Sequence, residues 1–188
     1  MSSDDSRTVV TIAHAPLEQV TPEMLAWWYC HIPGTMQYAG ETRPRYLVWH
    51  PLDHISYQLT SPGDVVGAGS RLHITEALGR DPGNLVDIHV TVETIDSREA
   101  ILTKRVLGTS IVRLENEFRP TSAGCRYTTH LTLGDTTPLA RLALNWIAHS
   151  RAFPPPKLSA WIRHHVEEIG NLENFLPDLF RYRADHEP

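Results

Sequence analysis

Strand-like segments separated by short turn signals occupy most of the chain between residues 46 and 133, and no other feature limits the possible folds as much. Hydrophobic and polar residues alternate within these segments, which is the pattern of strands with one buried face. Connections as short as these join antiparallel neighbours, so the sequence predicts a long antiparallel meander. The segments cover residues 46–60, 70–79, 84–95, 99–107, 110–119 and 124–133.

Helical segments lie on both sides of the meander. Thr21-Pro22 has the composition of a capped helix start, and a short strand at residues 8–13 precedes it. A second start of this kind, Thr137-Pro138, predicts a helix to about residue 152. After prolines 154–156, a longer helix is expected to run to about residue 180. This order predicts an α+β fold, in which a curved antiparallel sheet wraps around the long C-terminal helix.

Composition limits the domain count and the classes of partner. With 188 residues, 41% of them hydrophobic, the chain can form one domain with a sizeable core. Residues 8–182 are predicted to be that domain, with 1–7 as a disordered tail and 183–188 as a second tail. The formal net charge of -5, without a basic run, argues against a nucleic-acid partner. The polar start MSSDDSR and the lack of a long apolar run predict a cytoplasmic protein with no membrane partner.

The stretch RHHVEEIGNLENFLP, residues 163–177, combines apolar residues at helical spacing with pairs of histidines and glutamates. His164 and Glu168 are four residues apart and therefore lie on the same side of the helix, in the row of the apolar Trp161. His165 and Glu167 are expected to face solvent. The helix spacing alone leaves two interpretations open: an ordinary pair at the edge of the apolar stripe, or half of a metal site.

Glu76 is the acidic residue that strand alternation most clearly places on an interior face. Leu72, Ile74 and Leu78 share that face of the segment 70–79. A carboxylate among inward apolar residues is unfavourable unless it is paired or bound to a cation. Tyr127 is likewise an inward hydroxyl that needs a partner.

Two further histidines, His50 and His54, lie in the segment WHPLDH. Its proline indicates a bend or an edge, and simple alternation beyond the bend places His54 on the outer face. Imidazoles and carboxylates together suit a borderline divalent ion, with zinc first. An inert ion-pair network, in which Glu76 meets His164 or an arginine, remains the alternative.

The motifs WHPLDH and HHVEEIGNLENFLP resemble those of the 2,4-diacetylphloroglucinol hydrolases and their phloretin hydrolase relatives. The resemblance extends over most of the chain, from about residue 20 to about residue 180. It implies a helix-grip fold, like that of the birch-pollen allergen Bet v 1 and of START-type domains. It also implies a zinc-dependent hydrolase that cleaves the carbon–carbon bond between a phenolic ring and an acyl group. The implied substrate is a small aromatic acyl phenol, and a homodimer is left open.

The resemblance also implies roles for individual residues. Tyr46 matches a tyrosine that contacts the substrate, and Tyr127 is a candidate for a second one. Tyr46, with His50 as a relay, would hold a ring hydroxyl and help to protonate the ring carbon. His50 is also the alternative to His54 as a metal ligand. The implied zinc ligands are His54, Glu76, His164 and Glu168.

Aromatic residues offer a candidate substrate pocket, for which we select Trp28, Trp49 and Trp161. Aromatic clusters also form where a helix simply packs on a sheet. Helix-grip domains include non-catalytic binders of small hydrophobic or aromatic ligands, so a START-like or Bet v 1-like binding module is the alternative function. Metal content would distinguish the two functions.

Overall fold

The computed structural model describes residues 2–4, 7–137, 140, 145–147 and 153–182. Within these residues, nine strands form one antiparallel sheet in the order β1-β2-β11-β10-β9-β8-β7-β6, with β3 paired to the start of β11. The strands are β1 (Ser2–Asp4), β2 (Arg7–Ala13), β3 (Leu17–Glu18), β6 (His54–Leu59), β7 (Arg71–Ala77), β8 (Leu85–Ile95), β9 (Glu99–Val106), β10 (Thr109–Pro120) and β11 (Gly124–Leu133).

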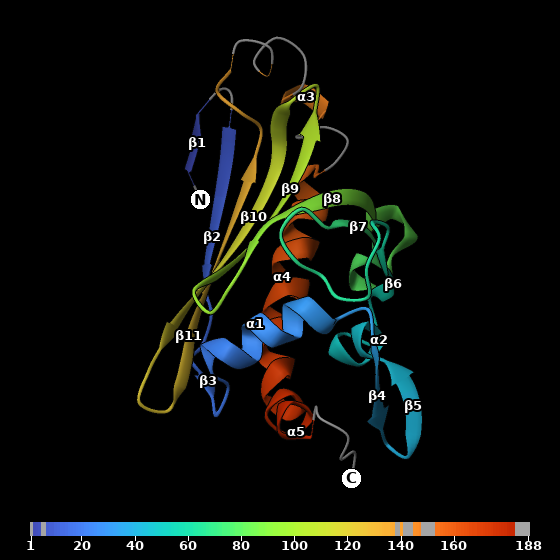
Figure 1. Ribbon diagram of the computed structural model, residues 1–188. Coiled ribbons are helices and arrows are strands. Elements are labelled where there is room, and N and C mark those ends of the chain that lie inside the picture. The colour runs from blue at the N-terminus through green and yellow to red at the C-terminus, as the bar shows by residue number, and fades with distance from the viewer. Residues whose placement is uncertain (1, 5–6, 138–139, 141–144, 148–152, 183–188) are drawn as a thin grey trace.

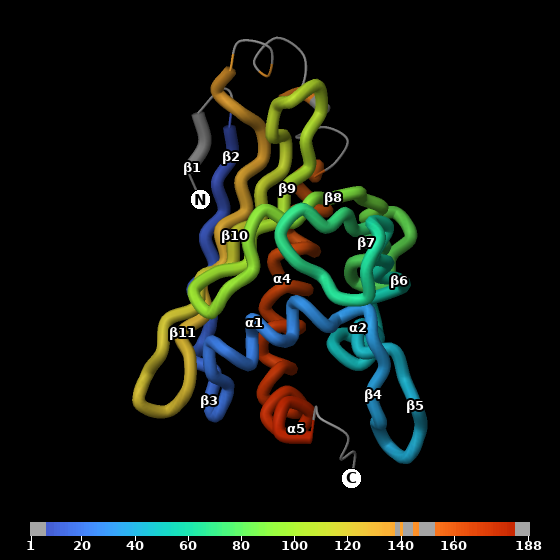
Figure 2. The backbone as a smooth tube through the Cα atoms, in the orientation of Figure 1, coloured from blue at the N-terminus to red at the C-terminus, as the bar shows by residue number. Residues whose placement is uncertain are grey.

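The longest helix of the described chain, α4, lies across this sheet (Figure 1). Strands β2, β11 and β10 run on one side of α4, and the sheet curves round to β8, β7 and β6 on the other (Figure 2). This arrangement confirms the predicted α+β helix-grip fold. The remaining elements are α1 (Pro22–His31), a hairpin of β4 (Thr35–Tyr38) and β5 (Glu41–Pro44), α2 (Arg45–Trp49), α3 (Asn145–Ile147), α4 (Pro155–Asn171) and α5 (Leu176–Arg181).

The predicted meander is present as β7 to β11. In β11, every second residue from Cys125 to Leu133 is buried, whereas the residues between them are more exposed. This alternation arises because successive side chains of a strand point to opposite faces and only one face meets α4. The start of α1 also agrees with its sequence signal, since the Met24 amide donates to Thr21 Oγ1 at 3.3 Å.

The expected strand 46–60 is in fact two elements. Residues 45–49 form the short helix α2, and a strand begins only at His54. The run YLVW is apolar without a gap, and such a run does not distinguish a short strand from a buried turn of helix. Tertiary contacts decide in favour of the helix. The Trp49 indole N–H donates to the Glu168 carbonyl at 2.8 Å, and Asn171 Nδ2 donates to the Val48 and Trp49 carbonyls.

The ends of the chain differ from expectation in two places. The backbone of Ser2–Asp4 pairs with Arg7–Val9, although these residues were expected to belong to a disordered tail. The long C-terminal helix stops at Asn171, and α5 starts separately because Pro177 cannot continue a helix from the residues before it. The helix expected from 138 to 152 falls largely outside the described residues.

The core is arranged around the two halves of α4. Its first half packs through Leu158 and Trp161 against strands β2, β10 and β11. Its second half packs through Ile169 against residues of α1, α2 and α5. Residues 164–168 lie between these two apolar contacts. None of the helices within the described residues is long and apolar enough to cross a membrane.

Candidate metal centre

Four titratable side chains from three elements meet between the sheet and α4. His54 begins β6, Glu76 lies near the end of β7, and His164 and Glu168 lie one turn apart on α4. His54 Nε2 is 3.4 Å from Glu168 Oε2 and 3.9 Å from Glu76 Oε1. His164 Nε2 is 3.7 Å from Glu168 Oε2 and 3.9 Å from Glu76 Oε2. The structure therefore brings together the four residues that the resemblance implied as ligands.

An irregularity in β6 turns His54 inward. His54 pairs with Glu76, but Ser56 pairs with Thr75, so Ile55 is an extra residue on this strand. Ile55 is exposed and His54 is buried, which is the reverse of what simple alternation predicted. A bulge of this kind shifts the alternation by one residue, and it therefore allows both His54 and Tyr57 to face inward.

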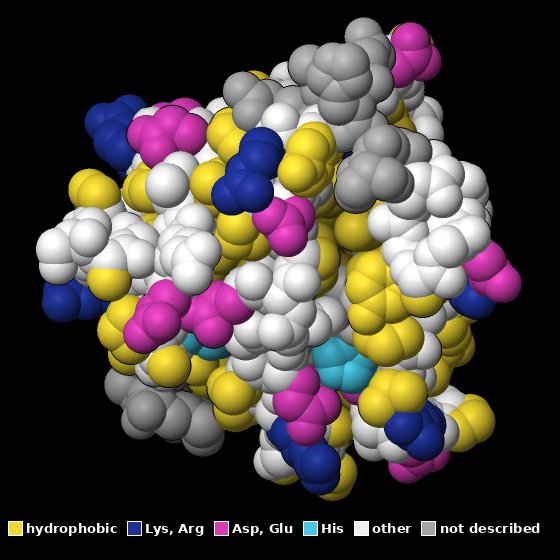
Figure 3. Space-filling model, turned by 90° about the horizontal axis from the view of Figure 1, so that it is seen from below, with side chains coloured by type: hydrophobic (Ala, Val, Ile, Leu, Met, Phe, Trp, Pro, Cys, Tyr) yellow, Lys and Arg dark blue, Asp and Glu magenta, His cyan; other side chains and the backbone are white. Residues whose placement is uncertain are grey.

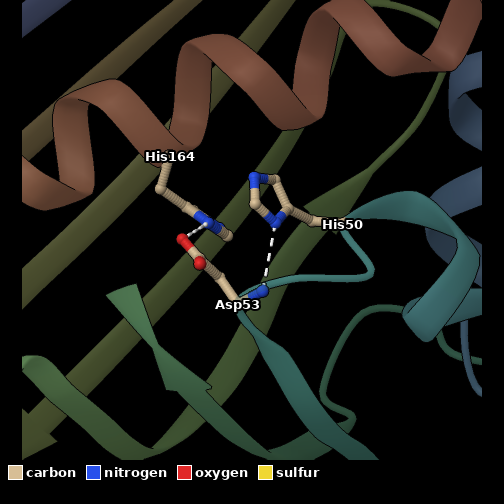
Figure 4. A group of neighbouring side chains, drawn as sticks. All are labelled: His50, Asp53 and His164. Atoms are coloured by element: carbon tan, nitrogen blue, oxygen red, sulfur yellow. Dashed lines mark hydrogen bonds and ion pairs between the residues drawn. The ribbon is translucent and has the colours of Figure 1, made fainter. Parts of the chain in front are cut away.

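Both histidines direct Nε2 toward the two carboxylates, because Nδ1 of each already has an acceptor. His54 Nδ1 donates to the Tyr46 carbonyl at 2.6 Å, and His164 Nδ1 donates to Asp53 Oδ2 at 3.1 Å (Figure 4). These bonds leave the lone pair of each neutral ring on Nε2. His54 Nε2 is buried and makes no hydrogen bond within the described residues.

This donor set suits a divalent ion. Ligand atoms placed about 2.0–2.2 Å from one ion in a tetrahedral arrangement lie about 3.3–3.6 Å from one another. The separations between each histidine Nε2 and the carboxylate oxygens, 3.4–3.9 Å, are close to that range and longer than ordinary N–H···O hydrogen bonds, with Glu76 presenting Oε1 to His54 and Oε2 to His164. One ligand atom each from His54, Glu76 and His164 lie within 4.8 Å of one another. Two imidazoles and two carboxylates are ligands that zinc accepts. A bound ion would explain why His54 Nε2 is buried without a hydrogen-bond partner among the described residues.

The electrostatics of the cluster favour charged carboxylates. Burial by itself raises the pKa of Glu168, but His165 and the two neighbouring histidines outweigh it and hold that pKa well below its usual range. Burial lowers the pKa of His164, whereas Glu168, Glu76 and Asp53 together raise it above its usual value. Carboxylates that favour positive charge on His164 can also favour a bound cation, which takes the place of a proton.

Sequence reasoning did not select two residues that contact the candidate ligands. Asp53 is buried and accepts from His164, and its other bonds go to the backbone of Gly79 and Arg80 beyond β7. His165 was expected to face solvent, but it is buried, and its Nδ1 contacts Glu168 Oε1. A signal for Asp53 did exist, since it directly precedes His54 in WHPLDH.

His50 lies beside the cluster and not within it. The Asp53 amide donates to His50 Nδ1 at 3.2 Å, and His50 Nε2 lies 3.3 Å from the exposed Glu167. The His50 and His164 rings are 4.5 Å apart (Figure 4). Of the two candidate histidines, His54 is therefore the one whose ring nitrogen meets Glu76 and Glu168.

Next to the four candidate ligands is a small cavity of about 60 Å³. Tyr46, Trp49 and Trp161 line it, as does Tyr57. The Tyr46 hydroxyl donates to Glu76 Oε1 at 2.5 Å, and burial together with Glu76 raises the pKa of Tyr46 well above its usual value. On the outer side of α2, a wider hollow of about 750 Å³ reaches His50 and His54. The space-filling view from below shows a histidine side chain in a hollow among hydrophobic side chains (Figure 3).

Two residues predicted near the substrate lie elsewhere. Trp28 packs against Trp49 and Phe175 and is fully buried in the core, outside the lining of the 60 Å³ cavity. Tyr127 is also absent from that lining, and its hydroxyl lies 2.5 Å from the Tyr29 hydroxyl. Trp28 belongs to the packing of α1 against α2 and Phe175, and Tyr127 to the packing of the sheet against α1. Such packing is the alternative that an aromatic cluster always allows.

The described residues hold two further groups of possible ligands: one is His50, Asp53 and His164, which shares His164 with this centre, and the other lies away from it. His73 and His89 face each other across β7 and β8 with stacked rings, and Asp87 accepts from His73 at 2.8 Å. These side chains are exposed or half-buried, in contrast to the buried cluster on α4.

Comparison with known proteins agrees with this architecture. The family model described as DAPG hydrolase PhiG domain matches residues 3–181. No curated protein matches the chain in sequence.

Among solved structures, the KanY protein is 15% identical with a TM-score of 0.54, and the match covers 90% of this chain and 96% of that one. Ara h 8.0201 is 11% identical with a TM-score of 0.54, covering 92% and 97%. The major latex-like protein 151 of Panax ginseng is 10% identical with a TM-score of 0.51, covering 89% and 95%. At these identities the likeness concerns the fold alone.

Proposed function

Because this chain belongs to the DAPG hydrolase family, whose domain model covers residues 3–181, we propose that it is a zinc-dependent hydrolase acting on acyl phenols. The reaction would break the bond between a phenolic ring carbon and an acyl carbon. Water supplies a hydroxyl to the acyl carbon and a proton to the ring carbon, so the products are a phenol and a carboxylic acid. The observation that carries the proposal is the buried His54 Nε2, which makes no hydrogen bond and points toward Glu76 and Glu168.

The ligands in this proposal are His54, Glu76, His164 and Glu168. When bound there, zinc would supply a Lewis acid for the acyl carbonyl and lower the pKa of water toward about 7. Four protein ligands usually make a closed site, whereas catalytic sites keep a position open. One carboxylate would therefore yield its place to substrate or water.

Tyr46 is the residue that we assign to proton transfer at the ring. It lines the cavity beside the ligands, and its raised pKa keeps the hydroxyl protonated at neutral pH. A protonated hydroxyl in that position can donate to a ring oxygen and then help to deliver a proton to the ring carbon. His50, proposed as a relay, does not line this cavity. Its role would therefore be limited to holding the loop that carries Asp53 and His54.

Substrate binding must enlarge the cavity. Sites for small organic ligands typically have about 300–1,000 Å³, and the cavity has about 60 Å³. Its aromatic lining by Trp49, Trp161 and Tyr57 suits a flat ring once these side chains move apart. The same lining would suit a non-catalytic binder of aromatic ligands, which is the competing function.

The test is metal analysis of protein purified without a histidine tag, combined with turnover of acyl phenols. We expect about one zinc per chain in the wild type, and loss of both metal and turnover in Glu168→Ala. Tyr46→Phe should keep the metal and lose about 10²- to 10⁴-fold in turnover. Tyr38→Phe, which alters an exposed tyrosine, is the matched control and should behave as the wild type. Full turnover in Glu168→Ala, or a wild type without metal, would contradict the proposal.

A further inference from the structure

His165 lies inside the molecule, next to the proposed ligands His164 and Glu168, and lines the same small cavity as they do. Its side chain is 3% exposed and lies between α4 and β11. The ring stacks on Trp161, with centroids 4.7 Å apart and planes inclined by 17°. A histidine so placed is held by packing and by both of its ring nitrogens.

The two oxygens of Glu168 have different partners. Oε1 contacts His165 Nδ1. Oε2 is the oxygen that lies 3.4 Å from His54 Nε2 and 3.7 Å from His164 Nε2. His165 thus occupies one carboxylate oxygen and leaves the other directed at the two histidine lone pairs.

The other nitrogen of His165 is anchored to the sheet. Thr129 donates its only hydroxyl hydrogen to Asn116 Oδ1 at 2.9 Å. Thr129 Oγ1 must therefore accept from His165 Nε2, which lies 2.9 Å away, so His165 can also donate from Nδ1 to Glu168 only as an imidazolium with a hydrogen on each ring nitrogen. Asn116 in turn donates to the Tyr29 hydroxyl at 3.1 Å, and Thr129 and Asn116 are fully buried. This buried chain of hydrogen bonds fixes the position of the imidazole ring relative to β10 and β11.

We propose that His165 is a positioning residue, which holds Glu168 so that only Oε2 faces the metal. The proposal rests on the proposed metal site and deepens it. Residues that orient ligands through a second hydrogen bond commonly change metal affinity about 10- to 100-fold when they are replaced. His165 would act in that way from α4, with Thr129 on β11 as its anchor.

Two substitutions at His165 separate its two hydrogen bonds. The amide nitrogen of asparagine lies near the position of Nδ1, and that of glutamine lies near the position of Nε2. His165→Asn can therefore still donate to Glu168, whereas His165→Gln can donate only toward Thr129. Zinc affinity, measured by competition with a chromophoric chelator, should fall about 10- to 100-fold in His165→Gln and much less in His165→Asn. The absorption spectrum of the cobalt(II) protein should change in His165→Gln, because it reports the arrangement of the ligands.

Thr129 provides a second, independent pair. Thr129→Ser keeps the hydroxyl and should bind zinc as the wild type does, whereas Thr129→Val removes the anchor and should bind it more weakly. Circular dichroism melting establishes which variants fold. If His165→Gln does not fold, the Thr129 pair still tests the proposal. Equal zinc affinity in both members of each pair would overturn the role of His165 alone. A wild-type protein that binds no zinc would overturn the proposed function, and this inference with it.

Discussion

Asp53 connects three parts of the candidate metal centre through one buried carboxylate. It accepts from His164 Nδ1 and from the amides of Gly79 and Arg80, which follow the strand that carries Glu76. Burial by itself would raise the pKa of Asp53, but these bonds lower it below its usual value. The side chain is therefore an anion that orients His164 and holds the end of β7 at the same time.

Asp53→Asn should weaken zinc binding about 10- to 100-fold, because an amide nitrogen can take the place of the oxygen that orients His164. Stability should also fall by about 1–3 kcal/mol, since the buried side chain at position 53 would lose its charge-assisted hydrogen bonds with the Gly79 and Arg80 amides. Chelator competition and urea unfolding measure the two effects. Asp81→Asn is a matched control, because Asp81 also accepts from a backbone amide but is exposed and remote from the ligands. Wild-type zinc affinity in Asp53→Asn would show that His164 does not depend on this bond.

The pKa of His14 leads to a prediction about how the stability of the folded protein depends on pH. Burial lowers the pKa of His14 to about 4, with His165 acting in the same direction and Glu168 opposing. The unfolded chain takes up this proton below about pH 6.5, but the folded chain does so only near pH 4. His14 therefore favours the folded state above pH 6.5, and this contribution is lost as the pH falls from 6.5 toward 4.

His14→Gln should lose less stability than the wild type over that interval. Glutamine can still donate to Thr129 Oγ1, which lies 3.1 Å from His14 Nε2, but it does not titrate. Urea unfolding at pH 7, 5.5 and 4.5 in the presence of a chelator measures the difference. If the two proteins lose stability in parallel, the pKa of His14 is not depressed in the folded state.

At the scale of whole elements, the join between β3 and β11 depends on a glycine. A Cβ atom added to Gly124 would lie 2.0 Å from the Leu17 carbonyl oxygen, which is a backbone atom that cannot move aside easily. In α4, by contrast, Gly170 is exposed and has nothing within 4 Å of the added atom.

Gly124→Ala should therefore destabilise the protein by about 1–3 kcal/mol through overpacking. Gly170→Ala should stabilise it by about 0.5–1 kcal/mol, because alanine loses less backbone entropy in a helix. The free energies of unfolding of the two variants test this pair. A destabilised Gly170→Ala would mean that the end of α4 is not a regular exposed helix.

The strands and helices also show how much of the structure could be predicted from the sequence. Strands β8 and β11 followed from alternation, because each has one face toward the core and the other toward solvent. The sequence could place Glu76 and the pair His164 and Glu168 for the same reason of periodicity. It could not orient His54, because a bulge is a property of how two strands pair and not of one strand's pattern.

His165 was missed for a related reason. Helical periodicity reveals only the apolar stripe of a helix. In α4, His165 lies beside that stripe and contacts the sheet through a polar group, the Thr129 hydroxyl. A buried polar chain leaves no hydrophobic pattern in the sequence, since its members satisfy one another only after the fold has brought them together.

At the scale of the whole molecule, zinc would act as a link between the sheet and the helix. Its ligands come from β6, β7 and α4, so an ion there would join parts of the chain that are about a hundred residues apart. A ligand that binds only the folded state stabilises it by about 4 kcal/mol when its free concentration is 1,000 times its dissociation constant.

Removing the metal with a chelator should therefore lower the Tm by about 10 °C, because about 1 kcal/mol corresponds to about 2–4 °C in a domain of this size. Adding zinc back should restore the Tm. Glu168→Ala is the control, because its Tm should not respond to either treatment. An equal response of the variant would place the stabilising ion at another site, such as the exposed group of His73, Asp87 and His89.

The extra residue in β6 has an evolutionary consequence. Because His54 pairs with Glu76 and Ser56 with Thr75, a lineage that lost the codon of the exposed Ile55 would pair β6 and β7 without a bulge and keep the imidazole of residue 54 on the inner face. An inward histidine opposite Glu76 is thus compatible with a chain that is one residue shorter in β6. Insertion or loss of this residue can therefore occur among related sequences without rebuilding the candidate centre.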